Sequence, residues 1–129
     1  MTALLFSLLL MAGGADLAWY THYEAGVRAV EGGDSDVAIE ALERALELKP
    51  DEELNVPIHS LQYVDYTPHL FLSIAHQQKG ALASAREELA KSEKAGVAEK
   101  SEYGRHLLEA QRIMLTGLSS KPLAARAGS

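Results

Sequence analysis

The feature that most constrains this chain is a helical hairpin pattern between residues 19 and 50. Residues 19–31 contain no proline, and the pair Gly32-Gly33 then breaks the first helix. Asp34 or Ser35 can cap a second helix by accepting hydrogen bonds from the amides of its first turn. Apolar and small residues recur along that helix at spacings of three and four, which predicts one buried face: Val37, Ala38, Ala41, Leu42, Ala45 and Leu48.

A second pattern of the same kind occupies residues 67–97. Thr67 can cap a helix, and Pro68 is tolerated in its first turn because the N–H that proline lacks has no partner there. The pattern predicts helices over residues 69–79 and 82–95, separated by Gly80. A hairpin of this kind leaves an apolar face that only a neighbour can cover. The chain is therefore predicted to be all-α, with two hairpins stacked on each other.

These residues resemble the tetratricopeptide repeat (TPR) family, whose pattern is W-x2-L-G-x2-Y…A-x3-F…P. The first hairpin matches at His22, Ala25, Gly26, Ala29, Ala38, Leu42 and Pro50. The second matches less fully at His69, Leu72, Ser73, His76, Ala85 and Leu89, with Val97 in place of the final proline. The resemblance covers residues 19–97. It implies a short α-α superhelix with an ordered insert between two repeats.

The chain is accordingly predicted to hold one TPR-like helical domain over residues 16–118, because 129 residues leave no room for a second core of ordinary size. Its parts are repeat one at 19–50, the insert at 51–66, repeat two at 67–97 and a capping helix at 98–116. The capping helix carries an apolar stripe that we expect to cover the last hairpin: Tyr103, Leu107, Ala110 and Met114. Residues 119–129 are predicted to form a disordered tail.

Residues 1–15 are predicted to be a signal peptide. Residues 3–11 carry no charge and precede the small residues Ala12-Gly13-Gly14-Ala15, as in cleaved leaders. The apolar run is too short to cross a hydrocarbon layer of about 30 Å, so no stable membrane span is expected after processing. Export would place the protein in the periplasm or outside the cell. The alternative is that this segment, which lacks Lys and Arg, is retained as an extra helix in a cytoplasmic protein.

The insert at residues 51–66 is too apolar for a solvated linker, since it contains Val56, Ile58 and Leu61. We expect it to be ordered and folded back onto the hairpins. A second interpretation is a binding loop, which rests on its imidazole and phenol side chains: His59, Tyr63 and Tyr66.

Composition and motifs argue against an enzyme. The absence of cysteine excludes disulfides, thiolate metal sites and thiol nucleophiles. Eighteen acidic and twelve basic residues give a net charge of −6, which disfavours nucleic acid as a partner. His22, His69 and His76 stand where the repeat pattern has Trp or Tyr, so they are predicted to be packing residues. No catalytic grouping, cofactor or metal site is expected.

The resemblance implies a protein partner, bound on the concave face that the first helix of each hairpin lines. The positions that correspond to this face mix aromatic, aliphatic and polar side chains, which suits a peptide or a partner helix: Tyr20, Tyr23, Val27, Val30, Glu31, Leu70, Ile74, Gln77 and Gln78. One TPR subclass binds a C-terminal carboxylate with Lys and Asn where this chain has Tyr23 and Val27. That ligand is therefore not expected.

Other hypotheses follow from the same residues. The leader, the insert or the last helix could fill the concave face. The chain could be a truncated or split regulatory domain of a larger enzyme or sensor, because two repeats fall short of the three or more that a stable stack usually needs. It could also self-associate to complete the stack. Residues 16–50 hold eight acidic and three basic residues, which would favour a basic partner, although solvated helix faces are usually charged.

Overall fold

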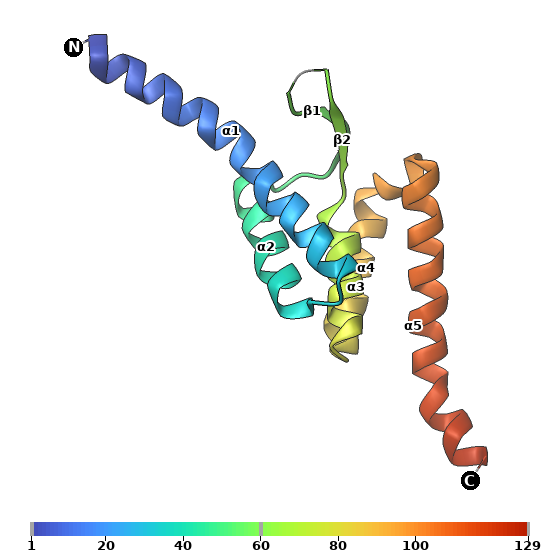
Figure 1. Cartoon of the computed structure of the whole chain (residues 1–129). Coiled ribbons are helices and arrows are strands. Elements are labelled where there is room, and N and C mark those ends of the chain that lie inside the picture. The colour runs from blue at the N-terminus through green and yellow to red at the C-terminus, as the bar shows by residue number, and fades with distance from the viewer. Residues whose placement is uncertain (1, 60, 129) are drawn as a thin grey trace.

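The computed structural model describes residues 2–59 and 61–128, with side chains for residues 17–59 and 61–118. Its elements follow the order α1, α2, β1, β2, α3, α4, η1 and α5 (Figure 1). The helices pack as hairpins, α1 against α2 and α3 against α4. The predicted all-α class is therefore confirmed, with the addition of a small two-stranded sheet.

The first hairpin consists of α1 (Thr2–Glu31) and α2 (Ser35–Leu48). Its turn places Gly33 at a φ of 78°, a left-handed conformation that glycine adopts without steric cost. The helices approach most closely at Gly26, where an added Cβ would lie 2.5 Å from Cγ of Leu42. Because α1 is one helix from Thr2 onwards, the predicted leader shares it with the first helix of repeat one. The side chains of residues 1–16 lie outside the described residues.

The predicted insert is an antiparallel β-hairpin formed by β1 (Glu53–Pro57) and β2 (Tyr63–Tyr66). Val56 pairs with Val64 and Glu53 with Tyr66, and an irregularity lies between these two pairs. Asn55, in the irregular part, has a φ of 53° and donates its N–H to Oδ1 of Asp65 at 2.9 Å. The order of the insert agrees with the prediction, whereas its two strands were not predicted.

The second hairpin consists of α3 (Pro68–Gln78) and α4 (Leu82–Ala95). Ser73 takes the place that Gly26 has in the first hairpin, and it is fully buried. Its Oγ donates a hydrogen bond of 2.8 Å to the carbonyl of Ala85 on α4. α4 ends at Gly96, which has a φ of 70°. This left-handed residue is the helix stop that the sequence predicts.

A short 3-10 turn, η1 (Ala98–Lys100), leads into α5 (Glu102–Gly128). The buried stripe of α5 is Gly104, Leu108, Gln111 and Leu115. The predicted packing stripe was therefore wrong in phase, because Tyr103 is 65% and Met114 49% exposed, Ala110 is exposed and Leu107 is only half-buried. α5 also continues past the predicted end at residue 116 into the predicted tail. The side chains of residues 119–129 lie outside the described residues.

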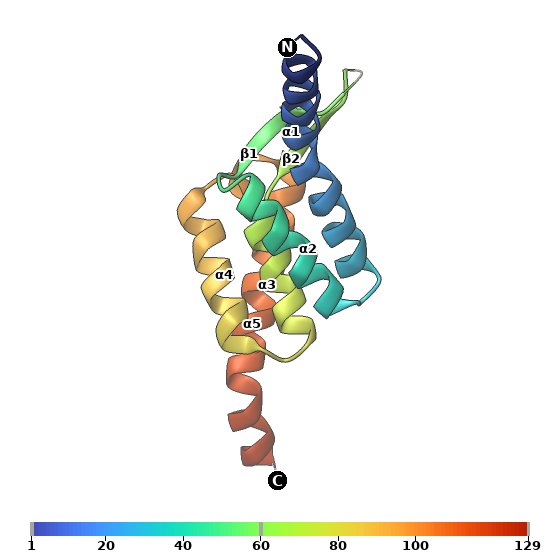
Figure 2. The same cartoon turned by 90° about the vertical axis from the view of Figure 1, so that its left-hand side faces the viewer.

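Two buried clusters hold these elements together, and α3 belongs to both. The larger cluster joins α1, α2, the sheet and α3, with Trp19, Tyr66 and Phe71 among its members. The smaller one joins α3, α4, η1 and α5 through Leu70, Ala85, Leu89, Ala98, Leu108 and Leu115. Figure 2 shows α3 at the centre, with α1 and α2 on one side, α4 on the other and α5 behind. In the part of the chain that the structure describes, no helix is both long and apolar enough to span a membrane.

Candidate functional site

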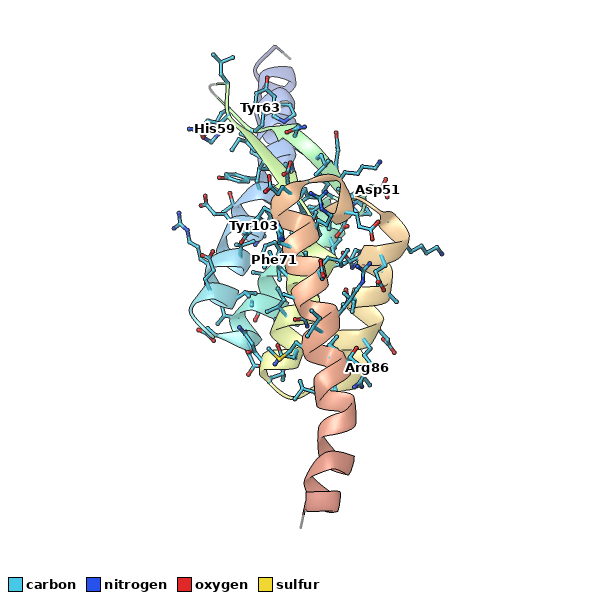
Figure 3. The ribbon with its side chains drawn as sticks, turned by 90° about the vertical axis from the view of Figure 1, so that its right-hand side faces the viewer. Asp51, His59, Tyr63, Phe71, Arg86 and Tyr103 are labelled. Carbon is cyan, nitrogen blue, oxygen red and sulfur yellow. The ribbon has the colours of Figure 1, made fainter. Side chains whose placement is uncertain are left out.

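A groove of about 480 Å³ runs between α1 and α5, and we call it the α1–α5 groove. α1 supplies one wall, the beginning of α5 supplies the other, β2 closes one end, and Phe71 of α3 lies between the walls. In Figure 3, Tyr103 and Phe71 are seen beside the beginning of α5 on the side towards α1, and Tyr63 is seen above them on the β-hairpin. The full lining is Tyr20, Tyr23, Glu24, Val27, Arg28, Glu31, Tyr63, Val64, Asp65, Thr67, Phe71, Ser101, Tyr103, Gly104 and Leu107.

Buried aromatic rings fix the end of the groove that β2 closes. Tyr66 lies edge-on to Trp19 at 4.8 Å and to Tyr23 at 5.0 Å between ring centres. Tyr23 also meets Phe71 edge-on at 6.1 Å. Edge-to-face pairs of this kind add about 0.5–1.5 kcal/mol beyond the burial of their area. The β-hairpin is therefore held firmly against α1 and α3.

The phenol groups of the same cluster bind backbone. Tyr23 donates its hydroxyl to the carbonyl of Asp65 at 2.9 Å and accepts from the N–H of Thr67 at 3.3 Å. Tyr66 donates to the carbonyl of Lys49 at 2.7 Å. Burial raises the pKa of Tyr23 to about 12, so this phenol stays protonated and keeps its donor role. These bonds fix where the insert leaves α2 and where it enters α3.

Carboxylates line the α1 wall. Tyr20 donates its hydroxyl to Oε2 of Glu24 at 2.7 Å, and this hydrogen bond is the main cause that raises the pKa of Tyr20. Arg28 lies 3.5 Å from the other oxygen of Glu24, with both side chains well exposed. Glu31 and Asp65 add two further carboxylates to the lining. The α1 wall thus carries two acidic side chains and one basic one, and Asp65 of β2 adds a third carboxylate at the closed end.

The α5 wall is mainly apolar. Tyr103 and Leu107 lie one helical turn apart and face α1 across the groove. Ala110 and Met114 continue the same row along α5, since they follow at spacings of three and four. Both of these side chains are exposed. The two walls therefore differ in chemistry, one being acidic and the other aliphatic and aromatic.

Four of the nine residues predicted from the sequence line this groove: Tyr20, Tyr23, Val27 and Glu31. Tyr23 is only 4% exposed, so its part is to hold the wall and the insert together. Val30 is buried in the larger cluster and Leu70 in the smaller one, so these two are corrected from binding residues to core residues.

The remaining predicted positions, on α3, do not line the groove. Ile74 is half-buried against the larger cluster, and Gln77 is half-buried as well. Gln78 donates from Nε2 to the carbonyl of Val30 at 3.0 Å and accepts from Oγ of Ser35 at 3.3 Å. The end of α3 therefore binds the turn of the first hairpin. The groove reaches α3 nearer its first turn, at Phe71.

Several groove residues were missed or assigned another role by sequence reasoning. Tyr63, one of the three side chains of the binding-loop interpretation, is 62% exposed and lines the groove. Its companion Tyr66 is fully buried and belongs to the core. Tyr103 and Leu107 were expected to pack on the last hairpin. Their helical spacing showed an apolar stripe, but nothing in it showed which element the stripe faces.

The three histidines that the sequence predicts to be packing residues are all half-buried, in different surroundings. Nδ1 of His69 lies 2.7 Å from Oε1 of Glu88, and the backbone N–H of His69 donates to Oε2 of Glu52 at 2.9 Å. Burial raises the pKa of Glu52 to about 7. His22 and His76 are half-buried on the far side of the molecule from the groove, where they border a depression against α2. Within the described residues, no group of three or more acidic or imidazole side chains is arranged to hold a metal ion.

The comparisons with known proteins give no relative: no family model, no curated protein and no solved structure matches this chain. The geometry and chemistry of the α1–α5 groove are thus the basis on which a function can be assigned.

Proposed function

We propose that this chain is a non-enzymatic protein-interaction module of tetratricopeptide-repeat type, which binds a peptide or a partner helix in the α1–α5 groove. The observation that carries the proposal is the meeting of tyrosines from three separate elements: Tyr20 from α1, Tyr63 from β2 and Tyr103 from α5. Tyrosine is enriched in protein interfaces because its apolar ring and polar hydroxyl bind many surfaces at little entropic cost. Tyr63 and Tyr103 are mostly exposed, so their rings are available to a ligand.

The repeat assignment draws support from how the hairpins pack. The family pattern has a small residue at equivalent positions of each first helix, here Gly26 and Ser73. Both are fully covered by the second helix of their hairpin, through Leu42 and Ala85 respectively. α1, α3 and α5 then act as successive first helices around one groove, which is how such a stack would offer a binding face.

The groove is tested by one matched pair of substitutions. Val27→Asn places a polar, uncharged group in the lining, whereas Val37→Asn makes the same change on an exposed site of α2. Peptides selected from a display library on the unaltered protein should bind the Val27→Asn variant about tenfold more weakly and the Val37→Asn variant unchanged. Tyr103→Ala should weaken binding without affecting the melting temperature. Equal affinities for all variants would refute the groove as the binding site. Tyr23→Ala is unsuitable, because that ring is part of the core.

A second candidate function is self-association through α5. Ile113 is 66% exposed and lies beside Met114, Gly117 and Leu118, which together form an apolar patch on this helix. A row of this kind on a long helix can pair with a second copy. Sedimentation equilibrium tests the idea: a concentration-dependent dimer that Ile113→Lys abolishes would support it. A monomer at every concentration would remove it.

Export remains part of the proposal, with residues 1–15 as a cleaved signal peptide. The support is the uncharged run of residues 3–11 followed by small residues. N-terminal sequencing of the protein recovered from its native cell decides the matter. A start near Asp16 supports export, and a start at Met1 or Thr2 contradicts it.

A further inference from the structure

The two walls of the α1–α5 groove differ in chemistry, so they fit a ligand that has two different sides. Glu24 and Glu31 lie two helical turns apart on α1, and Asp65 comes from β2 at the closed end. The opposite wall presents Leu107 and the ring of Tyr103. A bound segment would therefore meet carboxylates on one side and apolar groups on the other.

Glu24 and Glu31 are available to a ligand, whereas Oδ1 of Asp65 already accepts from a backbone N–H of β1 at 2.9 Å. Tyr20 holds one oxygen of Glu24 in place at 2.7 Å, which fixes the carboxylate without neutralising it. The contact of Glu24 with Arg28 is 3.5 Å long, and the Arg28 side chain is 74% exposed. An exposed pair of this kind contributes little and can be exchanged for a ligand's cation. Among the described residues, no ion pair engages Glu31.

Aromatic rings beside carboxylates also favour cations. The fold already uses this combination once, because Nζ of Lys49 lies 5.5 Å from the ring centre of Trp19 and 5.6 Å from that of Tyr66. The same Nζ makes an ion pair of 2.9 Å with Glu53. Tyr20, Tyr63 and Tyr103 give the groove the same two components, a ring face and a nearby carboxylate, with no lysine of the described residues in its lining.

We propose that the α1–α5 groove selects a basic amphipathic segment, with Lys or Arg side chains towards Glu24, Glu31 and Asp65 and aliphatic side chains towards α5. This inference rests on the proposed function and specifies the class of its ligand. An acidic segment of the same shape would place its carboxylates against those of the groove, and such like-charge contacts are strongly unfavourable. The net charge of −6 also attracts a basic ligand over a distance.

The test uses three synthetic amphipathic peptides of equal length that share a leucine face. Their polar face is lysine in the first, glutamine in the second and glutamate in the third. In fluorescence anisotropy at low salt, the lysine peptide should bind the full chain about tenfold more tightly than the glutamine peptide. The glutamate peptide should bind most weakly. Added salt should reduce the difference in affinity between the lysine and glutamine peptides, because it screens exposed charges.

Two charge-matched variants show whether the preference belongs to the groove. Glu24→Gln with Glu31→Gln removes two charges from the lining, and Glu40→Gln with Glu43→Gln removes two from the exposed side of α2. The groove variant should lose about tenfold in affinity for the lysine peptide and keep its affinity for the glutamine peptide. The α2 variant should change neither affinity more than about twofold. If both variants lost the same affinity for the lysine peptide, the preference for lysine would come from the overall charge of the protein, and the inference would be overturned.

The same peptides separate failure of the inference from failure of the proposed function. If all three bind equally, and Val27→Asn weakens all three, the groove binds peptides but charge selection is refuted. If Val27→Asn changes no affinity, the groove is not the binding site, and both proposals fall.

Discussion

The two helical hairpins bring their helices together at equivalent positions but by different means. In the first, Gly26 lets α1 approach Leu42 of α2, and the contact is one of shape alone. In the second, Ser73 donates to the carbonyl of Ala85 at 2.8 Å and accepts from Nε2 of Gln111 at 3.1 Å. The second contact is therefore polar, and it extends to a third helix.

This difference follows from the neighbours that each hairpin has. The first hairpin packs on the β-hairpin and α3, where aromatic rings provide the contact. The second must also hold α5, which forms the apolar wall of the groove. The hydroxyl of Ser73 joins α3, α4 and α5 in one buried network. The position of the α5 wall thus depends on the hydroxyl of Ser73. At the equivalent position of the first hairpin, Gly26 provides only space.

The largest effect is expected from closing the space at Gly26. In Gly26→Ala the new methyl group would meet Leu42 at 2.5 Å, well inside van der Waals contact. Overpacking costs about 1–3 kcal/mol, and the better helix propensity of alanine offsets about 1 kcal/mol of it, so at this close contact we expect a net loss of up to about 2 kcal/mol. Urea unfolding followed by circular dichroism measures it.

Two controls isolate the steric cause. Gly117→Ala in α5 meets nothing within 4 Å, so it should leave the free energy of unfolding unchanged or slightly higher. Combining Gly26→Ala with Leu42→Ala should cost less than the sum of the single changes, because the second change makes room for the first. Additive costs in this cycle would argue against a direct contact.

A smaller loss is expected from the serine contact. Ser73→Ala removes a donor and leaves Nε2 of Gln111 without its buried acceptor, which should cost about 1–1.5 kcal/mol. Ser92 is the matched control, because it is equally buried but its Oγ has no hydrogen-bond partner. Ser92→Ala should be neutral or stabilising. If both variants lose the same stability, the network gives no special support to α5.

The smallest predicted effect concerns the junction of the two hairpins, where Glu52 accepts from the N–H of His69 at the start of α3. Burial raises the pKa of Glu52 from 4.5 to about 7, so the folded protein holds this proton more tightly than the unfolded chain. The resulting stabilisation is fully present below pH 4.5 and is lost as the pH rises through 7. Between pH 6 and 7 the free energy of unfolding of the unaltered protein should fall by about 1 kcal/mol more than that of Glu52→Gln. Parallel pH curves for the two proteins would refute this assignment.

The helical hairpins were predictable because their signals are local. Gly33 and Gly80 adopt the left-handed turn conformation that their positions suggest. Pro68 opens α3, and Gly96 ends α4. Ala38, Leu42 and Ala45 are buried on α2 as their spacing predicts, whereas Val37 and Leu48, which were placed on the same face, are exposed. Each of these features depends on a few neighbouring residues and on little else.

The groove was only partly predictable because it depends on long-range contacts. β1 and β2 have five and four residues, at the short end of the lengths over which alternation indicates a strand. Tyr23 is buried because Tyr66, distant in the sequence, folds back onto it. Apolar side chains cover so much of α5 that spacing does not reveal which of them pack. Only the packing of α5 against α3 and α4 shows that the row with Leu108 is buried and the row with Tyr103 is exposed.

The central claim is that ligands bind in the α1–α5 groove, and amide chemical shifts test it most directly. The lysine-faced amphipathic peptide is titrated into the ¹⁵N-labelled full chain. We expect the largest shift changes in residues 20–31, 63–67 and 101–107, the segments of the chain from which α1, β2 and the start of α5 line this groove. Shift changes confined to α2, or changes that Val27→Asn leaves unaltered, would contradict the account.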